Sequence, residues 1–218
     1  MAKLNKDVVL KALDWAYDKS LNGLPGAETA EELAENYLRK AKSIEEAANS
    51  LIGWQVSKSA TSGFLTGLGG LVTLPVAIPA NLLSVLYVQM RMIAAIAHMG
   101  GYDLRDDKVK TFVYMCLCGN GVKDIIKDVG IVLGQKITRV AIQKISGTVI
   151  TKINQKIGFR LLTKFGSKGV VNLGKMVPVA GGLIGGTFDG VSTATIGKVA
   201  KKMFIQNGND GYAIPLNA

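Results

Sequence analysis

The longest uncharged segment of this chain runs from Ser59 to Met90, and it limits the folds that the chain can adopt. Its 32 residues contain no Asp, Glu, Lys or Arg. Its first third is rich in glycine. Pro75 follows at a position that resembles a helix start, where proline is tolerated, and Pro79 is expected to kink or restart that helix. From Pro79 to Met99 the sequence is a continuous apolar helix pattern, which Gly100 and Gly101 end. Such a helix must lie either inside a protein core or in a bilayer.

The residues of this helix favour the protein core. A membrane span needs about 20 apolar residues, and the segment 71–99 is long enough. However, Asn81, Gln89, Arg91 and His98 interrupt it, and an Arg inside a bilayer costs a few kcal/mol at least, about 2.5 or more. We therefore predict a buried central helix of a soluble or peripheral protein, and a true span is the alternative.

Helical signals dominate the rest of the chain. Apolar spacing predicts a helix at about 5–20. Thr29 with Glu32 and Ser43 with Glu46 form capping-box patterns, which predict helices at 30–42 and 44–60. Two further helices are expected between residues 103 and 130, with a break at 119–121. Sustained two-residue alternation is absent, so the predicted class is all-α: a helical bundle with glycine-rich apolar central helices.

The domain organisation follows from the change in composition near residue 62. We expect an N-terminal amphipathic helical segment at 1–62, a glycine-rich apolar and basic core at 63–206 that forms one domain with it, and an irregular tail at 207–218.

Positive charge is concentrated in the second half of the chain. Residues 1–107 carry 10 bases and 12 acids, whereas residues 108–218 carry 16 bases and 4 acids. A net charge of +12 in one half indicates an anionic partner, either a membrane surface or a nucleic acid. A solvated basic face without a partner is the alternative.

The bases recur at multiples of four residues in one part of this half, and most are followed by an apolar residue. They are Lys136, Lys144, Lys152, Lys156, Arg160, Lys164 and Lys168. Residues four apart share a helix face, so the pattern predicts a basic stripe beside an apolar stripe. We expect the bases to bind anionic lipid and their apolar neighbours to insert. A period of four drifts by about 40° per step around a helix, so helix breaks or bends are expected near Gly147, Gly158 and residues 166–169.

Nucleic acid is the weaker candidate partner. Binders of single strands combine bases with aromatic stacking, and only Phe159 and Phe165 are aromatic between residues 136 and 175. No helix-turn-helix, RNA-binding or zinc-finger pattern is present.

Four polar residues lie within otherwise apolar stretches: Gln89, Arg91, Asn154 and Asp189. Buried polar groups need partners, so an internal network is expected, with Arg91 paired to Asp189 or to the acids at 103–107. The alternative is a polar pocket for a lipid headgroup, in a lipid-binding or lipid-modifying enzyme.

A ridge of small residues is the basis of a third functional alternative. Gly182, Gly186 and Gly190 recur every four residues, a spacing that lets another helix approach closely. Such a ridge suits an interaction subunit of a membrane transporter.

The residues of catalytic and metal chemistry are sparse. Asp103, Asp106 and Asp107 could hold a cation, but Asp103 also fits a helix N-cap and the other two a first turn. Cys116 and Cys118 are expected to be packed thiols, because zinc needs about four ligands and the chain has one His. No phosphate-binding loop or nucleophile elbow occurs. We predict no catalytic residue, metal or cofactor.

Several motifs together resemble the bacterial EcsC family. They are Gly23-Leu24-Pro25-Gly26, Gly63-Phe64, Thr73 through Asn81, Gln89-Met90-Arg91, Lys152-Ile153-Asn154, Gly158 through Leu161, Lys164-Phe165-Gly166, and Pro178 through Gly186 with Asp189. The resemblance covers residues 20–205. It implies an intracellular, mainly helical protein that works at the membrane, and it supplies no catalytic residues. Together with the basic stripe, it predicts a cytoplasmic protein at the inner face of the membrane, linked to membrane transport and not clearly an enzyme.

Overall fold

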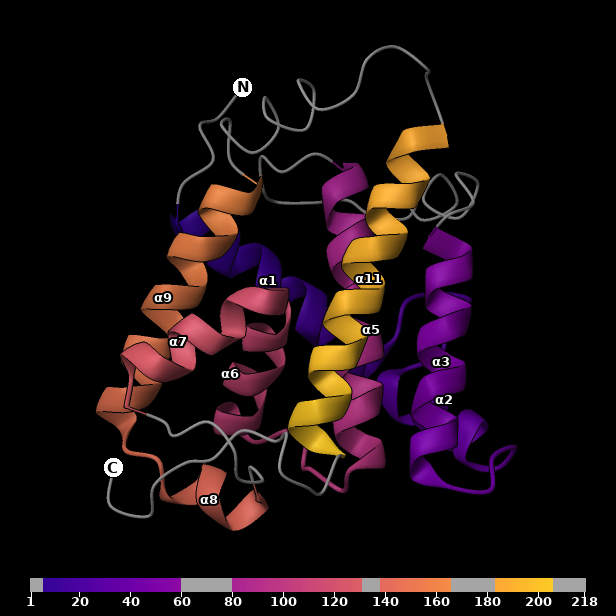
Figure 1. The fold of residues 1–218 in the computed structure, drawn as a ribbon, viewed down its shortest axis with the longest axis horizontal. Helices are drawn as coiled ribbons and strands as arrows, with labels where there is room; N and C mark the ends of the chain where they lie inside the picture. The colour runs from indigo at the N-terminus through magenta and orange to yellow at the C-terminus, as the bar shows by residue number, and fades with distance from the viewer. Residues whose placement is uncertain (1–5, 60–79, 131–137, 166–182, 206–218) are drawn as a thin grey trace.

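The computed structural model describes residues 6–59, 80–130, 138–165 and 183–205. Within these ranges the chain is helical and contains no β-strand, apart from one isolated bridge between Leu24 and Ala27. The helices pack around one hydrophobic core, to which both the N-terminal segment and the C-terminal helix contribute. The predicted all-α class, a helical bundle, is confirmed (Figure 1).

Helix α5 (Ala80–Met99) lies at the centre of this bundle. It packs against α1 (Lys6–Asn22), α2 (Ala30–Leu38), α3 (Ile44–Ser59), α6 (Asp107–Cys116) and α11 (Leu183–Phe204). Every side chain from residue 86 to residue 97 is buried, which confirms the predicted central helix. In the described ranges, no helix combines the length and the apolar character that crossing a membrane requires. Residues 71–79 of the predicted segment lie outside those ranges.

The N-terminal helices begin where their caps predict. Thr29 and Glu32 form the complete capping box of α2, whereas the Glu46 side chain accepts its bond from the backbone N–H of Lys42 and not of Ser43. The predicted end of α2 at residue 42 is wrong, because the chain leaves the helix after Leu38 through turn bonds at Lys40 and Ala41. These helices form one side of the bundle.

The chain from residue 103 to residue 130 forms two helices, as predicted. Helix α6 and α7 (Val122–Asp128) are separated by the short 3₁₀ helix η1 (Gly119–Gly121). The N-cap of α6 is Asp106, whose carboxylate accepts from the backbone N–H of Lys108 at 2.7 Å. The predicted N-cap at Asp103 is therefore wrong, and that side chain accepts from the backbone N–H of Arg105 in the preceding turn.

The basic region is divided between two helices, α8 (Arg139–Lys144) and α9 (Gly147–Phe165). The break predicted near Gly147 is confirmed. Of the break or bend predicted near Gly158, the break is absent, because α9 continues through this buried residue. One glycine inside a helix costs about 1 kcal/mol, and the packing of α9 against α1, α6 and α7 outweighs that cost. The break predicted at 166–169 lies outside the described residues.

Candidate functional site

The apolar and basic residues of α9 differ in burial. Ile153, Ile157 and Leu161 are completely buried, whereas Lys152 and Lys156 are exposed and Arg160 and Lys164 are half-buried. The apolar half of the predicted stripe is thus the core-facing side of an amphipathic helix. The expectation that these neighbours insert into lipid is wrong, because they already pack inside the protein.

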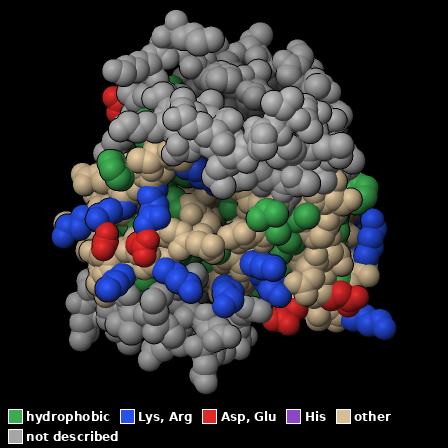
Figure 2. Space-filling view, turned by 45° about the horizontal axis from the view of Figure 1, so that its top comes forward, with side chains coloured by type: hydrophobic (Ala, Val, Ile, Leu, Met, Phe, Trp, Pro, Cys, Tyr) green, Lys and Arg blue, Asp and Glu red, His purple; other side chains and the backbone are tan. Residues whose placement is uncertain are grey.

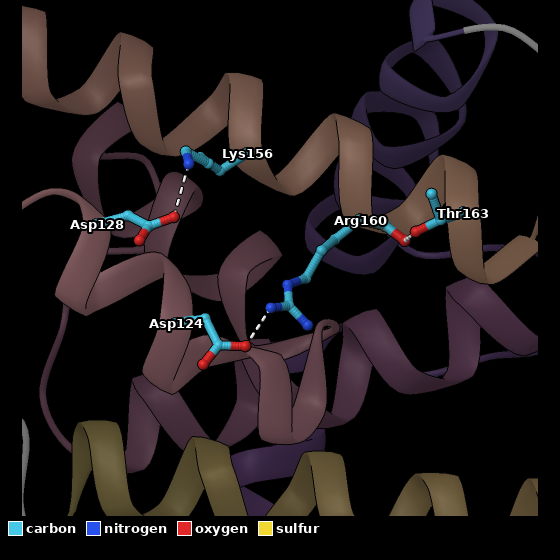
Figure 3. Close-up of polar contacts among 5 residues, drawn as sticks. All are labelled: Asp124, Asp128, Lys156, Arg160 and Thr163. Atoms are coloured by element: carbon cyan, nitrogen blue, oxygen red, sulfur yellow. Dashed lines mark hydrogen bonds and ion pairs between the residues drawn. The ribbon is translucent and has the colours of Figure 1, made fainter.

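Two bases of α9 form ion pairs with α7 (Figure 3). The Lys156 ammonium lies 2.6 Å from Asp128 Oδ2, and the Arg160 guanidinium binds the Asp124 carboxylate. The two acids are four residues apart on α7, and the two bases are four residues apart on α9. The order of the acids along the chain is opposite to that of the bases, so α7 supplies one acid for each base. We call these two pairs the ion-pair ladder. The hydrogen bond from Lys156, and then its charge, lower the pKa of Asp128.

The second rung of the ladder depends on the glycine at the start of α7. A Cβ at Gly121 would lie 2.5 Å from Arg160 Nη1 and 2.9 Å from its Cδ. The Arg160 side chain therefore crosses directly over the backbone of Gly121 to reach Asp124. A sequence pattern that lists only the bases gives no indication of this partnership.

The last base of α9 in the described ranges points towards η1 and α11. Lys164 Nζ lies 3.4 Å from the backbone oxygen of Leu117 and 3.4 Å from Ser192 Oγ. Two adjoining hollows of about 200 and 280 Å³ are lined by both Lys164 and Cys118.

Burial raises the pKa of Cys118 to about 12, although the charges of Lys164 and Arg160 oppose the shift. A thiol that stays protonated at neutral pH is a poor nucleophile.

The exposed side of α9 carries an aromatic residue that the sequence pattern did not single out. Phe159 is 66% exposed, and it lines a groove of about 300 Å³ with Lys152, Gln155 and Lys156 of α9 and with Asp128 and Val129 from the end of α7. Two exposed bases of α7, Lys123 and Lys127, precede the ladder acids by one position. In Figure 2, bases form a band across the whole face in view, with acids among them at the left and at the lower right.

We call the exposed surface of α7 and α9 the basic face. These two helices carry six bases and two acids, a net charge of +4. Lys144 is exposed at the end of α8, whereas Lys136 and Lys168 lie outside the described residues. The basic face therefore includes part of the predicted stripe and adds Lys123, Lys127 and Phe159. The positive charge of the second half of the chain is a sequence signal for the two lysines. The signal for Phe159 is its position two residues after the buried Ile157, since residues two apart point to opposite sides of a helix.

A model of the EcsC protein family matches residues 3–206, nearly the whole chain. This chain belongs to the EcsC protein family. The predicted resemblance is confirmed. No curated protein and no solved structure matches the chain.

Two of the polar residues that carry the EcsC resemblance lie on α5 but contact different elements. Gln89 donates to Thr193 Oγ1 of α11 at 3.2 Å. Arg91 donates to the backbone oxygen of Glu28 at 3.0 Å, and its guanidinium lies over the Tyr87 ring at 5.4 Å. The predicted pairing of Arg91 with the acids at 103–107 is wrong, because Arg91 faces the α1–α2 connection. Gln89 faces α11 instead, since residues two apart on a helix point about 200° apart.

Of the other two predicted polar residues, the structure describes the side chain of Asn154 alone. Asn154 is half-buried on α9, which packs mainly against α1, α6 and α7. Asp189 belongs to α11, and its side chain lies outside the described residues. The described part of this EcsC protein therefore does not bring Gln89, Arg91 and Asn154 into one polar pocket.

The predicted glycine ridge falls mainly in the first half of α11. Gly182 lies outside the described residues, and Gly186 and Gly190 belong to the helix. Gly197 follows Gly190 by seven residues, or nearly two turns, so it shares their side of the helix. A Cβ at Gly197 would lie 2.7 Å from Ile52 Cγ1 of α3. Close helix packing is thus observed at Gly197, and the ridge at Gly186 and Gly190 stays a prediction.

The acidic cluster before α6 has structural roles. Asp103 and Asp106 both accept backbone hydrogen bonds. Within the described ranges, no three His, Cys, Asp or Glu side chains gather into a group that could hold a metal ion.

Proposed function

We propose that this EcsC protein docks reversibly on an anionic phospholipid surface, at the inner face of the membrane, through the basic face of α7 and α9. The observation that carries the proposal is the exposed Phe159 beside Lys152 and Lys156, on a helix whose other described apolar side chains are buried or half-buried. An aromatic ring flanked by lysines suits the boundary between headgroups and acyl chains, where one part is apolar and the other charged.

The strength of such docking can be estimated from its parts. Each base near an anionic surface contributes about 1 kcal/mol, and a buried Phe side chain contributes about 1.5–3 kcal/mol. Lys156 and Arg160 contribute less than Lys152, because the ladder acids already neutralise much of their charge. The sum corresponds to reversible, salt-sensitive attachment.

Flotation with vesicles tests the proposal. The protein is mixed with neutral phosphatidylcholine vesicles, or with the same vesicles containing phosphatidylglycerol, at low and high salt. We expect binding to the anionic vesicles at low salt alone, because salt screens exposed charges. Binding to neither kind of vesicle contradicts the proposal.

Matched variants locate the docking surface. Lys127→Glu with Lys152→Glu should abolish flotation, whereas Lys40→Glu with Lys42→Glu changes the charge equally at exposed sites between α2 and α3 and should not. Likewise, Phe159→Ser should weaken binding more than Ile44→Ser, which removes another exposed apolar side chain, at the start of α3. If the variants of the basic face weaken flotation no more than their controls do, the basic face has no special role in docking.

A further inference from the structure

The groove beside Phe159 is a more specific feature than a charged surface. Its volume of about 300 Å³ lies at the lower end of ligand-pocket sizes, about 300–1,000 Å³. It combines two lysines, an amide and an aromatic ring from α9 with the end of α7. A flat electrostatic dock needs no such combination of side chains in one depression.

The charges in this groove are unequal because the ion-pair ladder ends inside it. Asp128, the last residue of α7, is paired with Lys156. Lys152 lies one helical turn before Lys156 on α9, and α7 supplies no further acid opposite it. The sequence contains no Asp or Glu between Asp128 and Asp189. The groove therefore offers an exposed ammonium whose charge the ladder does not balance.

Among the described lining residues, the groove has one carboxylate, Asp128, and this acid is compatible with an anionic ligand. Lys156 neutralises Asp128 at 2.6 Å, and an ammonium has three donors, so Lys156 can bind Asp128 and a second acceptor together. Gln155 adds an amide donor between the two lysines in sequence. These donors match the oxygens of a phosphodiester, and the ring of Phe159 matches the apolar part of a lipid next to it.

We infer that the groove binds the glycerophosphodiester headgroup of a single anionic phospholipid. Lys152 and Lys156 bind the phosphate oxygens, Gln155 donates a hydrogen bond, and Phe159 packs against the glycerol and the first acyl carbons. This inference rests on the proposed membrane docking and names the lipid group that the basic face recognises.

Titration calorimetry with dihexanoyl phosphatidylglycerol, kept below its micelle concentration, tests the inference on the full chain. We expect saturable binding at one site. Lys152→Gln and Phe159→Ala should each weaken binding by about tenfold, which corresponds to 1.4 kcal/mol. The control Lys127→Gln removes an exposed base outside the groove and should change the affinity less than about twofold, which is 0.4 kcal/mol. All three side chains are exposed, so circular dichroism should show unchanged helicity.

Three results would overturn the inference: no saturable binding by the wild type, equal binding of inorganic phosphate, or equal losses in Lys152→Gln and Lys127→Gln. The vesicle experiment separates this failure from that of the proposed function. If the soluble lipid does not bind but anionic vesicles still float the protein, docking stands without a headgroup site. If neither binds, both proposals fail.

Discussion

At the scale of single residues, Cys118 shows how burial restricts the chemistry of this protein. Its pKa rises from an ordinary value of 9.0 to about 12 through burial, and burial raises the pKa of the Cys116 thiol too. Burial is also the main cause of the raised pKa values of Tyr17 and Tyr114, which lie edge-to-face between α1 and α6. These groups stay neutral in the folded protein at pH values where they ionise in the unfolded chain.

This difference predicts loss of stability in alkali. When a folded-state pKa is raised, the unfolded chain binds fewer protons as the pH increases, so its stability relative to the folded state grows. For Cys118 the stability is fully present below pH 9.0 and is lost as the pH rises towards about 12. The slope from one such group is at most about 1.4 kcal/mol per pH unit.

Urea denaturation of the wild type and of Cys118→Val measures this effect at about pH 7, 9 and 10.5, which lie below, near and above the ordinary pKa of a thiol. The variant keeps an apolar side chain but cannot ionise, so its stability should fall less steeply above pH 9.0. If the free energy of unfolding falls equally steeply with pH in the two proteins, the raised pKa of Cys118 is contradicted.

At the scale of elements, two glycines in packed helices should respond in opposite ways to the same substitution. Gly53 of α3 has open space where a Cβ would lie, whereas a Cβ at Gly197 of α11 would meet Ile52 at 2.7–3.1 Å. Gly53→Ala should raise the free energy of unfolding by up to about 1 kcal/mol through helix propensity. Gly197→Ala should lower it by about 1–3 kcal/mol through overpacking. Thermal and urea denaturation measure both, and a stabilised Gly197→Ala protein would refute the close packing of α3 and α11.

The ion-pair ladder should reduce the affinity of the basic face for anions. Asp124→Asn with Asp128→Asn releases Arg160 and Lys156 and raises the net charge of α7 and α9 from +4 to +6. At about 1 kcal/mol per charge, binding to anionic vesicles should tighten by up to about 30-fold. Stability should change little, since exposed ion pairs contribute about 0–1 kcal/mol each.

Titration of the protein with anionic vesicles measures this gain in affinity. The control Glu31→Gln with Glu35→Gln makes the same charge change on the exposed side of α2 and should have a smaller effect. If the ladder variant binds no tighter than this control, then α7 does not mask the bases of α9.

The sequence predicts these elements well where the signal is local. The capping residues of α2, the break at 119–121 and the buried α5 all follow from spacing and composition. The role of the basic repeat was only partly predictable, because a period of four describes one helix and not what packs against it. The acids of α7 reach Lys156 and Arg160 across a gap of 28 and 36 residues in the chain, and only tertiary packing reveals such partners.

At the scale of the whole molecule, the basic face and the most acidic segment of the first half lie on different sides of the bundle. Helix α9, on the left of Figure 1, belongs to the basic face, whereas α2 and α3 lie on the right. The chain from Glu28 to Glu46 carries six acids and three bases. An anionic surface attracts one side and repels the other, so docking should orient the protein with α9 towards the surface.

Site-specific fluorescence tests this orientation most directly. An environment-sensitive maleimide dye is attached to Thr163→Cys, one turn after Phe159 on α9, or to Ser50→Cys on α3; both positions are exposed. The wild type, labelled in parallel, gives the background from Cys116 and Cys118, whose raised pKa values keep them protonated at neutral pH.

With anionic vesicles, the dye at position 163 should shift its emission to the blue as it enters an apolar environment, and the dye at position 50 should not. Neutral vesicles should shift neither dye. Equal shifts at both positions, or a larger shift at position 50, would contradict docking through α7 and α9.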